Sequence, residues 1–175
     1  MLYLKNEQFT FSFVESEIRN KTFGILTTLN KDGSPHSTGV LYGVSSPDSD
    51  FVLYIITSLK YKKTKNIINN PQVSFVIPFP HHILRFVPSS TVTFYGEVKI
   101  LPFVDHEDLL AIFSEKRILR LITEHLTDEE KEDYVFLKLK PSPKVYCYGL
   151  GFNLFKLRGS HTEGGYTVFI PEERL

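Results

Sequence analysis

The stretch Thr57-Ser58-Leu59-Lys60-Tyr61-Lys62-Lys63-Thr64-Lys65 joins two segments of different periodicity. The segment that leads into it, Phe51 to Thr57, is apolar on both faces, which predicts a strand buried on both sides. The residues from Lys60 to Asn70 suit a helix, and Pro71 ends it because proline disfavours helical geometry in the preceding residue. A helix N-terminus offers unpaired N–H groups and partial positive charge, so lysines and hydroxyls gathered there predict a phosphate site. A solvated helix face or a nuclear localisation patch would explain the same lysines.

Most of the other segments favour strands. Phe23 to Leu29 and Ser37 to Val44 flank an Asp-Gly turn at Asp32-Gly33, which predicts a hairpin. A long strand is expected from Thr91 to Leu101, and Gly96 inside it is typical of a bulge or bend in a curled sheet. The pattern predicts a mainly β fold, a small antiparallel barrel with flanking helices. Further strands are expected at 73–77, 135–139, 145–148 and 166–170.

Three helical segments are expected beside the strands. In the 60–70 helix, Ile67 and Ile68 are the expected apolar contacts. A longer helix is predicted over residues 105–126, with a break near Ser114. A short helix is expected to begin at Thr127, where a capping-box pattern precedes an acidic run. The strand that follows should have one wet face, occupied by Phe136, Lys138 and Lys140.

Length and composition restrict the class of protein. A chain of 175 residues with 42% hydrophobic residues is expected to form one domain over residues 1–175. The 20 basic and 20 acidic side chains cancel, which argues against a general nucleic-acid or membrane-surface binder. Cys147 is the one cysteine, so a disulfide framework is excluded and a buried apolar role is expected. The charged start lacks a signal-peptide pattern, and no apolar run is long enough to span a bilayer, so a cytoplasmic protein is expected.

The order of segments from about Phe23 to Leu139 resembles the pyridoxamine 5′-phosphate oxidase-like family of flavin mononucleotide (FMN)-binding split barrels. The resemblance is sharpest from Tyr54 to Val76, where a strand ending in threonine, a basic loop, a helix ending Asn-Asn-Pro and a further strand follow one another. It implies an antiparallel split β-barrel, an FMN cofactor and a homodimer with the cofactor between two subunits. In that family the strand-end threonine and two basic residues hold the flavin phosphate. These roles fall on Thr57, with Ser58 beside it, and on Lys62 and Lys63.

The sequence departs from the family pattern in three places. Where the oxidases carry an arginine and a lysine on the second strand, this chain has Thr38 and Gly43. Thr91 replaces a glutamine early in the fifth strand, so Thr38 and Thr91 are expected as shorter cofactor contacts. The oxidases hold the substrate phosphate with an Arg-x-His motif, whereas here one more residue separates Arg158 from His161. Arg158 and His161 are therefore weak candidates for substrate binding, and the substrate is left open.

The resemblance implies an oxidoreductase whose chemistry belongs to the flavin. No catalytic side chain and no metal site is assigned, because no nucleophile, acid–base pair or metal-ligand spacing stands out. Two alternatives keep the barrel but change the ligand, to the deazaflavin F420 or to haem. His81 and His82 are adjacent, so they are poorly spaced for one ion but could offer one imidazole to haem iron. A third alternative is a non-catalytic dimeric sensor that binds another anion through its lysines, and Arg174 is assigned no role.

Overall fold

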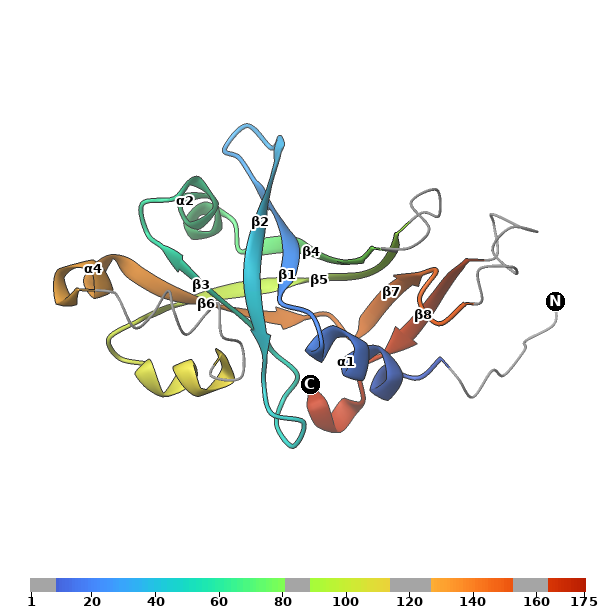
Figure 1. Ribbon diagram of the computed structural model, residues 1–175. Coiled ribbons are helices and arrows are strands. Elements are labelled where there is room, and N and C mark those ends of the chain that lie inside the picture. Colours follow the sequence, from blue (N-terminus) through green and yellow to red (C-terminus); the bar gives the residue numbers. More distant parts are fainter. Residues whose placement is uncertain (1–8, 81–88, 114–126, 153–163) are drawn as a thin grey trace.

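The computed structural model describes residues 9–80, 89–113, 127–152 and 164–175 (Figure 1). Eight antiparallel strands form one sheet in the order β4-β1-β2-β3-β6-β5-β7-β8, and a further pairing of β4 with β5 closes the first six into a barrel. This confirms the predicted mainly β class and the split barrel. The strands are β1 (Phe23–Leu29), β2 (Pro35–Val44), β3 (Leu53–Ser58), β4 (Gln72–Phe79), β5 (Ser90–Pro102), β6 (Tyr134–Pro141), β7 (Lys144–Tyr148) and β8 (Gly165–Phe169).

The long strand β5 is shared by the barrel and by the β7–β8 hairpin that extends from it. One edge of β5 pairs continuously with β4 from Ser90 to Glu97. The other edge pairs first with β7, over Thr91 to Thr93, and then with β6, over Gly96 to Pro102. The β4 register runs through Gly96 without a bulge. Glycine is needed there because a Cβ would lie 2.3 Å from the carbonyl oxygen of Lys140.

The β1–β2 hairpin forms as the Asp-Gly turn predicts. Gly33 has φ +82°, a conformation that glycine adopts without a Cβ clash. Its N–H donates to the carbonyl of Asn30 over 2.9 Å, and a carboxylate oxygen of Asp32 accepts from the N–H of Ser34 over 2.9 Å. The turn sets the register that pairs Phe23 with Leu41 and Ile25 with Gly39.

Apolar side chains are buried on both sides of the barrel wall. One cluster fills the interior, with Leu26, Ile55 and Phe94 fully buried. A second cluster lies outside the wall, where Phe136 stacks on Phe103 at 5.1 Å and packs near Phe113. The prediction of a wet face at Phe136 was wrong, because a 3-10 segment, η1 (Glu107–Phe113), covers that face.

The helix α1 (Phe11–Arg19) precedes the barrel and was not predicted from the sequence. Its signals were present: Thr10 accepts a capping hydrogen bond from the N–H of Phe13, and Val14 and Ile18 are fully buried. The Tyr42 hydroxyl donates to the carbonyl of Ile18 over 2.6 Å. Burial raises the pKa of that phenol, so it remains a neutral donor that fixes α1 to β2.

A carboxylate on α1 is held by two arginines. Glu15 is buried, and its side chain pairs with Arg19 at 2.5 Å and with Arg174 at 3.1 Å. Arg174 also donates to the carbonyls of Ser46 and Ser49 in the β2–β3 loop. The side chain to which the sequence assigns no role thus ties the last 3-10 turn, η2 (Glu172–Arg174), to α1 and to a loop. We name Glu15, Arg19 and Arg174 the arginine clamp.

The remaining helices follow the predictions in part. Helix α2 (Lys62–Asn69) forms, with Ile67 buried as predicted but Ile68 exposed. Helix α4 (Asp128–Asp133) begins directly after Thr127, as expected. Within the predicted 105–126 helix, residues 107–113 are 3-10 and residues 114–126 lie outside the described part. Among the described residues, the helices are too short and too polar to cross a membrane.

Candidate functional site: a pocket at the start of helix α2

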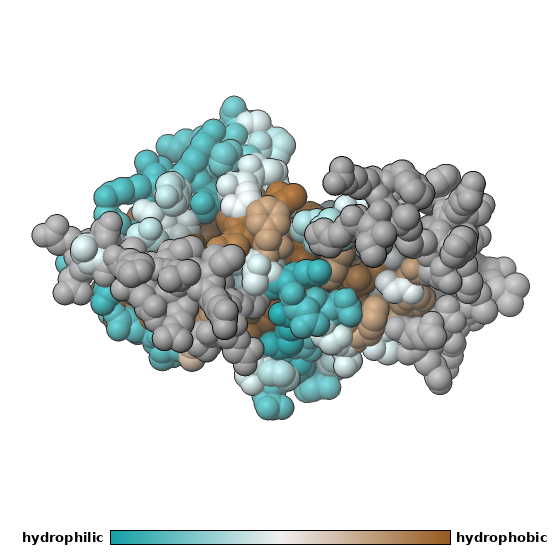
Figure 2. Space-filling view, viewed as in Figure 1, coloured by the Kyte–Doolittle hydropathy of each residue, from teal (hydrophilic) through white to brown (hydrophobic). Residues whose placement is uncertain are grey.

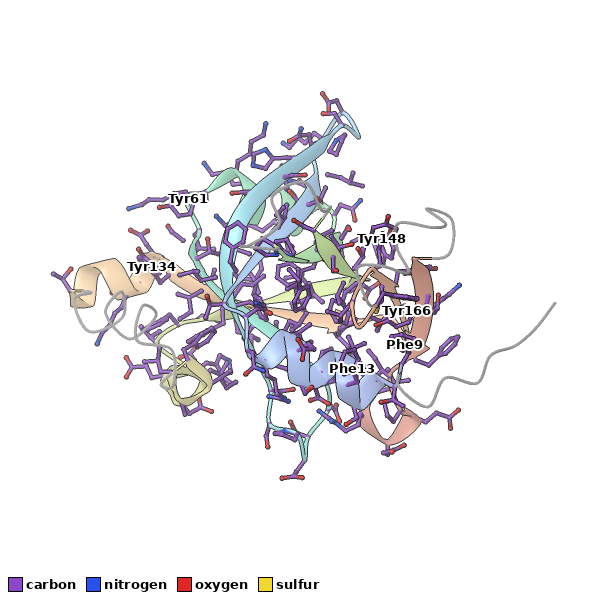
Figure 3. The ribbon with its side chains drawn as sticks, turned by 45° about the vertical axis from the view of Figure 1, so that its right-hand side comes forward. Phe9, Phe13, Tyr61, Tyr134, Tyr148 and Tyr166 are labelled. Carbon is purple, nitrogen blue, oxygen red and sulfur yellow. The ribbon has the colours of Figure 1, made fainter. Side chains whose placement is uncertain are left out.

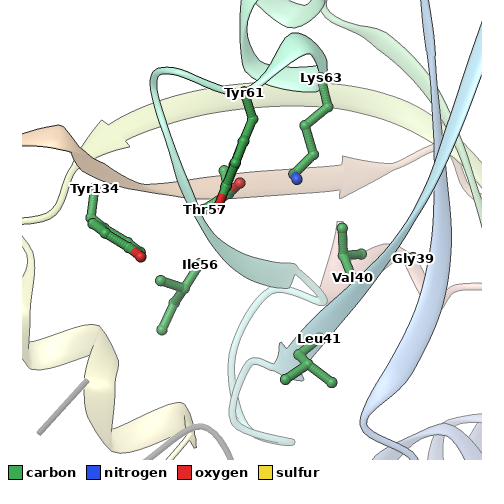
Figure 4. A pocket seen from close by; sticks show the side chains of 8 residues that line it. All are labelled: Gly39, Val40, Leu41, Ile56, Thr57, Tyr61, Lys63 and Tyr134. Carbon is green, nitrogen blue, oxygen red and sulfur yellow. The ribbon is translucent and has the colours of Figure 1, made fainter. Parts of the chain in front are cut away.

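A pocket of about 200 Å³ opens between β2, the end of β3, the start of α2 and the start of β6 (Figure 4). Strand β3 contributes its floor, and the Lys60–Asp133 ion pair joins the β3–α2 loop to the end of α4. The β3–β6 register extends to the Ser58–Tyr134 pair, which brings Tyr134 to the pocket. The lining residues are Gly39, Val40, Leu41, Ile56, Thr57, Tyr61, Lys63 and Tyr134.

Thr57 places a polar atom without a partner in this wall. The residue is 3% exposed, and its Oγ1 is buried with no hydrogen-bond partner among the residues that the structure describes. A buried hydroxyl without a partner costs about 1–3 kcal/mol in folding free energy. Since buried polar groups are otherwise paired, the hydroxyl is positioned for a partner that the described residues do not supply.

Lys63 supplies the positive charge of the pocket. Its side chain is half-buried, and burial lowers the pKa of its ammonium group. The Nζ atom lies 4.5 Å from the ring centroid of Tyr61, a cation–π contact. Figure 4 shows the Lys63 side chain reaching down from α2 towards the space between Tyr61 and Val40. The pocket thus combines an ammonium group with a hydroxyl that lacks a partner.

The N-terminus of α2 is held firmly but is left uncapped. The Thr64 hydroxyl donates to the carbonyl of Ser58 over 2.8 Å, and the Asn66 amide donates to Thr28 and to Asn30, each over 3.1 Å. The N-cap residue is Tyr61, which makes no side-chain capping bond. Because the first N–H groups of a helix have no acceptor within the helix, these groups add to the attraction for an anion.

The structure separates the lysines that the sequence groups together. Lys63 lines the pocket, whereas Lys62 is exposed and lies where its charge lowers the pKa of Asp32 slightly, after the larger effect of the Ser34 hydrogen bonds. Lys60 forms the ion pair with Asp133 described above. Of the basic pair in the family resemblance, only Lys63 lines the pocket, and the cofactor role of Lys62 stays a prediction.

The other predicted cofactor residues are placed differently. Ser58 is buried next to Thr57, but its Oγ accepts from the N–H of Lys60 over 3.2 Å and does not line the pocket. Thr38 precedes Gly39 on β2 and does not line the pocket. Thr91 lies on β5, which contributes nothing to the lining. Their cofactor roles stay predictions.

At Gly43, where the oxidases carry a second-strand lysine, no larger side chain could enter. A Cβ on Gly43 would lie 2.7 Å from Ile112 and about 3 Å from Phe113, so η1 fills that space. The candidate substrate residues Arg158 and His161 lie outside the described residues, as do His81 and His82. Cys147 is 4% exposed, as expected, and burial raises the pKa of its thiol to about 11.

Several pocket residues were not anticipated from the sequence. Gly39 and Leu41 come from β2, and Tyr134 comes from β6, so they join Thr57 only through the register of the sheet. Gly39 carries a local constraint, since a Cβ there would lie 2.7 Å from the ring of Phe23. Tyr61 was visible within the lysine-rich stretch, but nothing in the sequence distinguished it from a solvent-exposed residue.

The chemistry that the lining can perform is binding. Its ionisable side chains are Lys63, Tyr61 and Tyr134, and its eight residues include no carboxylate, imidazole or thiol. Figure 3 shows Tyr61 and Tyr134 near α2 and α4, far from Phe9, Phe13, Tyr148 and Tyr166 near α1 and the β7–β8 hairpin. The site suits an anionic ligand that brings its own reactive group.

Solved structures with the same fold bind different cofactors. An F420 reductase has 23% identity and a TM-score of 0.54, over 73% of this chain and 92% of that one. The heme storage protein HutZ from Vibrio cholerae has 18% identity and a TM-score of 0.61, over 82% and 98%. A FAD-binding protein from Mesorhizobium loti has 20% identity and a TM-score of 0.57, over 78% and 92%. Likeness at this level of identity shows the fold alone.

Sequence comparison identifies the family. No curated protein matches the chain. The family model for pyridoxamine 5′-phosphate oxidase matches residues 12–143, which include α1 except Phe11, the six barrel strands as far as the end of β6, and every residue that lines the pocket. The closed six-stranded barrel described above is consistent with that match. The chain therefore belongs to the pyridoxamine 5′-phosphate oxidase-like family of split-barrel proteins.

Proposed function

We propose that this protein binds FMN, with the flavin phosphate held at the start of α2, and that it is an oxidoreductase whose substrate is unknown. The Lys63 ammonium would pair with the phosphate, Thr57 Oγ1 would donate to it, and the uncapped N–H groups of α2 would complete the contact. A flavin supplies hydride chemistry at its own ring, so the protein needs only to bind and orient it.

The observation that carries this proposal is the buried Thr57 hydroxyl without a partner. An apolar residue at this position would avoid the desolvation cost, so a threonine makes physical sense if a ligand satisfies it. The residue that carries this hydroxyl lines the same small pocket as Lys63. A phosphate dianion can accept hydrogen bonds from both groups at once.

The eight lining residues favour a phosphate-bearing cofactor over haem. They offer a cation and a hydroxyl, which suit phosphate, and no imidazole, thiolate or thioether for an axial iron bond. Both FMN and F420 carry a phosphate group, and an F420 reductase is among the structural neighbours. Binding experiments therefore have to compare the two.

The test is a titration of the purified protein with FMN, riboflavin, F420 and haem, followed by flavin fluorescence or visible absorbance. We expect FMN to bind at least tenfold more tightly than riboflavin, which lacks the phosphate. Equal affinity for FMN and riboflavin would contradict a phosphate site. Tight binding of F420 or haem with no binding of FMN would replace the cofactor assignment. Binding of inorganic phosphate alone would favour the anion-sensor alternative.

We further propose that the active form is a homodimer, because one chain offers only part of a nucleotide site. The pocket, at about 200 Å³, is smaller than the roughly 300–1,000 Å³ of typical small-molecule sites. The pocket residues Gly39 and Leu41 pair with Ile25 and Phe23, and cross-strand partners point to the same face of a sheet. The pocket therefore opens beside Phe23, which is 47% exposed.

The same face continues across β4, β5, β7 and β8. Through successive cross-strand pairs it presents Tyr95, Tyr146, Tyr148 and Phe169, which are all exposed. Figure 2 shows apolar residues exposed between the hydrophilic cover of α2 and the side of the molecule that carries β7 and β8. We name these four residues and Phe23 the aromatic face. Exposed apolar surface of this kind is typical of a protein interface, which supports a dimer formed through this face.

Replacing Tyr146 and Phe169 with glutamate is expected to convert the dimer to a monomer and to weaken FMN binding. The two introduced carboxylates would lose their hydration in the interface, with Lys144 beside them, and this loss of hydration is costly. Light scattering should give twice the 20.2 kDa chain mass for the wild type and the chain mass for the variant. Ile68→Glu, on the exposed side of α2, is the control and should stay dimeric. A monomeric wild type that binds FMN fully would refute the dimer.

Replacing Thr57 with valine is expected to separate stability from binding. Valine has nearly the same shape and removes the unpaired hydroxyl, so the ligand-free protein should gain up to about 1 kcal/mol in unfolding free energy. FMN affinity should fall about 10-fold or more, because a hydrogen bond to a phosphate dianion is charge-assisted and worth at least about 1.5 kcal/mol. Urea denaturation and an FMN titration measure the two effects. A loss of stability together with unchanged affinity would assign Thr57 a structural role.

FMN binding is expected to be strongest between about pH 6 and the lowered pKa of Lys63. Below about pH 6 the phosphate gains a proton and loses charge. As pH rises through the pKa of Lys63, which burial places below the usual 10.5, the ammonium is lost. The unfolded chain binds this proton more tightly than the folded one. The contribution of Lys63 to the free energy of unfolding therefore increases as the pH rises from the lowered pKa of the folded protein to the usual 10.5. Affinity measured across pH, with a parallel denaturation series, separates weakened binding from unfolding.

A further inference from the structure

Tyr61 occupies a helix position that its residue type does not favour. It is the N-cap of α2, with φ −77° and ψ 149°; its carbonyl accepts from the N–H groups of Thr64 and Lys65, but its side chain makes no capping hydrogen bond. Serine, threonine, aspartate and asparagine are preferred there because their side chains accept from the first helical N–H groups. The ring is also 54% exposed, so neither capping nor core burial accounts for a tyrosine at this position.

The ring of Tyr61 does have a specific contact, which lies at the pocket. It lines the wall beside Thr57, and the Lys63 Nζ is 4.5 Å from its centroid. In Figure 4 the ring extends from the β3–α2 loop alongside Thr57, and the end of the Lys63 side chain points into the pocket next to the ring. None of the eight lining residues carries a carboxylate that could hold this ammonium instead.

We propose that Tyr61 is a positioning residue that holds the Lys63 ammonium at the pocket through its ring. The effect of this contact on binding rests on the proposed function, since the ammonium is held where the phosphate would bind. A lysine side chain carries four flexible bonds, and a half-buried ammonium would otherwise turn towards water. The ring face compensates part of the lost hydration without cancelling the charge, as a carboxylate would.

The contact between Tyr61 and Lys63 determines what Lys63 does before and after an anion binds. In the ligand-free protein the ring is the contact of Lys63 at the pocket wall. A phosphate dianion attracts the ammonium more strongly than a ring face does, so Lys63 shifts its contact to the anion while the loop stays in place. Less side-chain freedom is lost on binding because the lysine is already near its bound position.

The first experiment needs no cofactor. Reductive dimethylation with ¹³C keeps lysine charged and places NMR-visible methyl groups on its nitrogen. We expect the Lys63 signal, assigned by its absence in Lys63→Met, to be shifted upfield by the Tyr61 ring current in the ligand-free protein. Tyr61→Phe should retain that shift and Tyr61→Leu should abolish it. A Lys63 signal at the position of exposed lysines in the wild type would overturn the proposal, whether or not FMN binds.

The second experiment measures the effect on binding. Tyr61→Leu should weaken FMN binding about 2- to 30-fold and leave riboflavin affinity unchanged, and Tyr61→Phe should rescue FMN binding. In a Lys63→Met background the same change should have no further effect. Equal losses for FMN and riboflavin, or full additivity with Lys63→Met, would show that Tyr61 acts on the fold and not through Lys63. If wild-type protein binds no FMN, the proposed function fails and the NMR experiment alone decides the role of Tyr61.

Discussion

Replacing Lys63 with methionine is expected to weaken FMN binding about 10- to 150-fold, the worth of a charge-assisted hydrogen bond of about 1.5–3 kcal/mol. Methionine keeps the length and apolar stem of lysine and removes only the charge. The half-buried Nζ lies at the pocket with a ring as its neighbour, so nothing else in the lining replaces it. Fluorescence titration with FMN measures the loss, and riboflavin affinity should change little.

Lys62→Met and Lys65→Met are matched controls for that variant. Each removes one positive charge from α2, but both lysines are exposed and neither lines the pocket. Screened surface charges are worth about 0.2–1 kcal/mol, so an affinity loss of at most about 5-fold is expected. Losses of FMN affinity of similar size in all three variants would mean that the net positive charge of α2 attracts the flavin phosphate, and that Lys63 makes no specific contact with it.

Replacing Arg174 with methionine is expected to lower the free energy of unfolding by about 2–3 kcal/mol, since several charge-assisted hydrogen bonds are lost from a mostly buried carboxylate. The side chains of Arg174 and Glu15 are 14% and 10% exposed, so solvent screens their pairing little. Arg19 still contacts Glu15 in the variant, which limits the loss. Urea denaturation followed by circular dichroism measures it.

The arginine clamp also predicts a ranking among its members. Arg19→Met should cost less than Arg174→Met, because the Arg19 side chain is 27% exposed and water can partly replace it. Lys31→Met, in the exposed β1–β2 turn, is the surface control and should change stability by less than about 0.5 kcal/mol. A loss below about 0.5 kcal/mol for Arg174→Met would mean that the clamp contributes little. FMN affinity should be unchanged, because the clamp does not line the pocket.

Local patterns predicted those parts of the fold that depend on neighbouring residues. The Asp32-Gly33 turn set the β1–β2 hairpin, and Pro71 ended α2 within a residue of the expected place. Helix α1 was missed although Thr10 and the buried Val14 and Ile18 carry its signals, because it is short and precedes the family resemblance. The burial of Phe136 depends on η1, which lies more than 20 residues earlier in the chain, so alternation along β6 could not reveal it.

The candidate site was predictable only where it is continuous in the chain. Thr57 and Lys63 were both chosen from one stretch, and both line the pocket. Gly39 and Tyr134 join them through strand pairing, which a single sequence does not specify. The different surroundings of Lys62 and Lys63 follow from the rotation of 100° between successive helix residues, which directs adjacent side chains to different sides.

The sharing of β5 between two substructures has a mechanical consequence. Detaching β7 and β8 from the barrel requires breaking the short register at Thr91 to Thr93 and exposing Val145, Cys147 and Val168, whereas opening the barrel requires breaking a long ladder along β4 or β6. Every lining residue of the pocket lies on or between β2, β3, α2 and β6, on the side that this peripheral hairpin does not support. Amide protons of β7 and β8 are therefore expected to exchange with solvent through local opening while the pocket keeps its geometry, and such opening would disturb the proposed dimer contact before the proposed phosphate site.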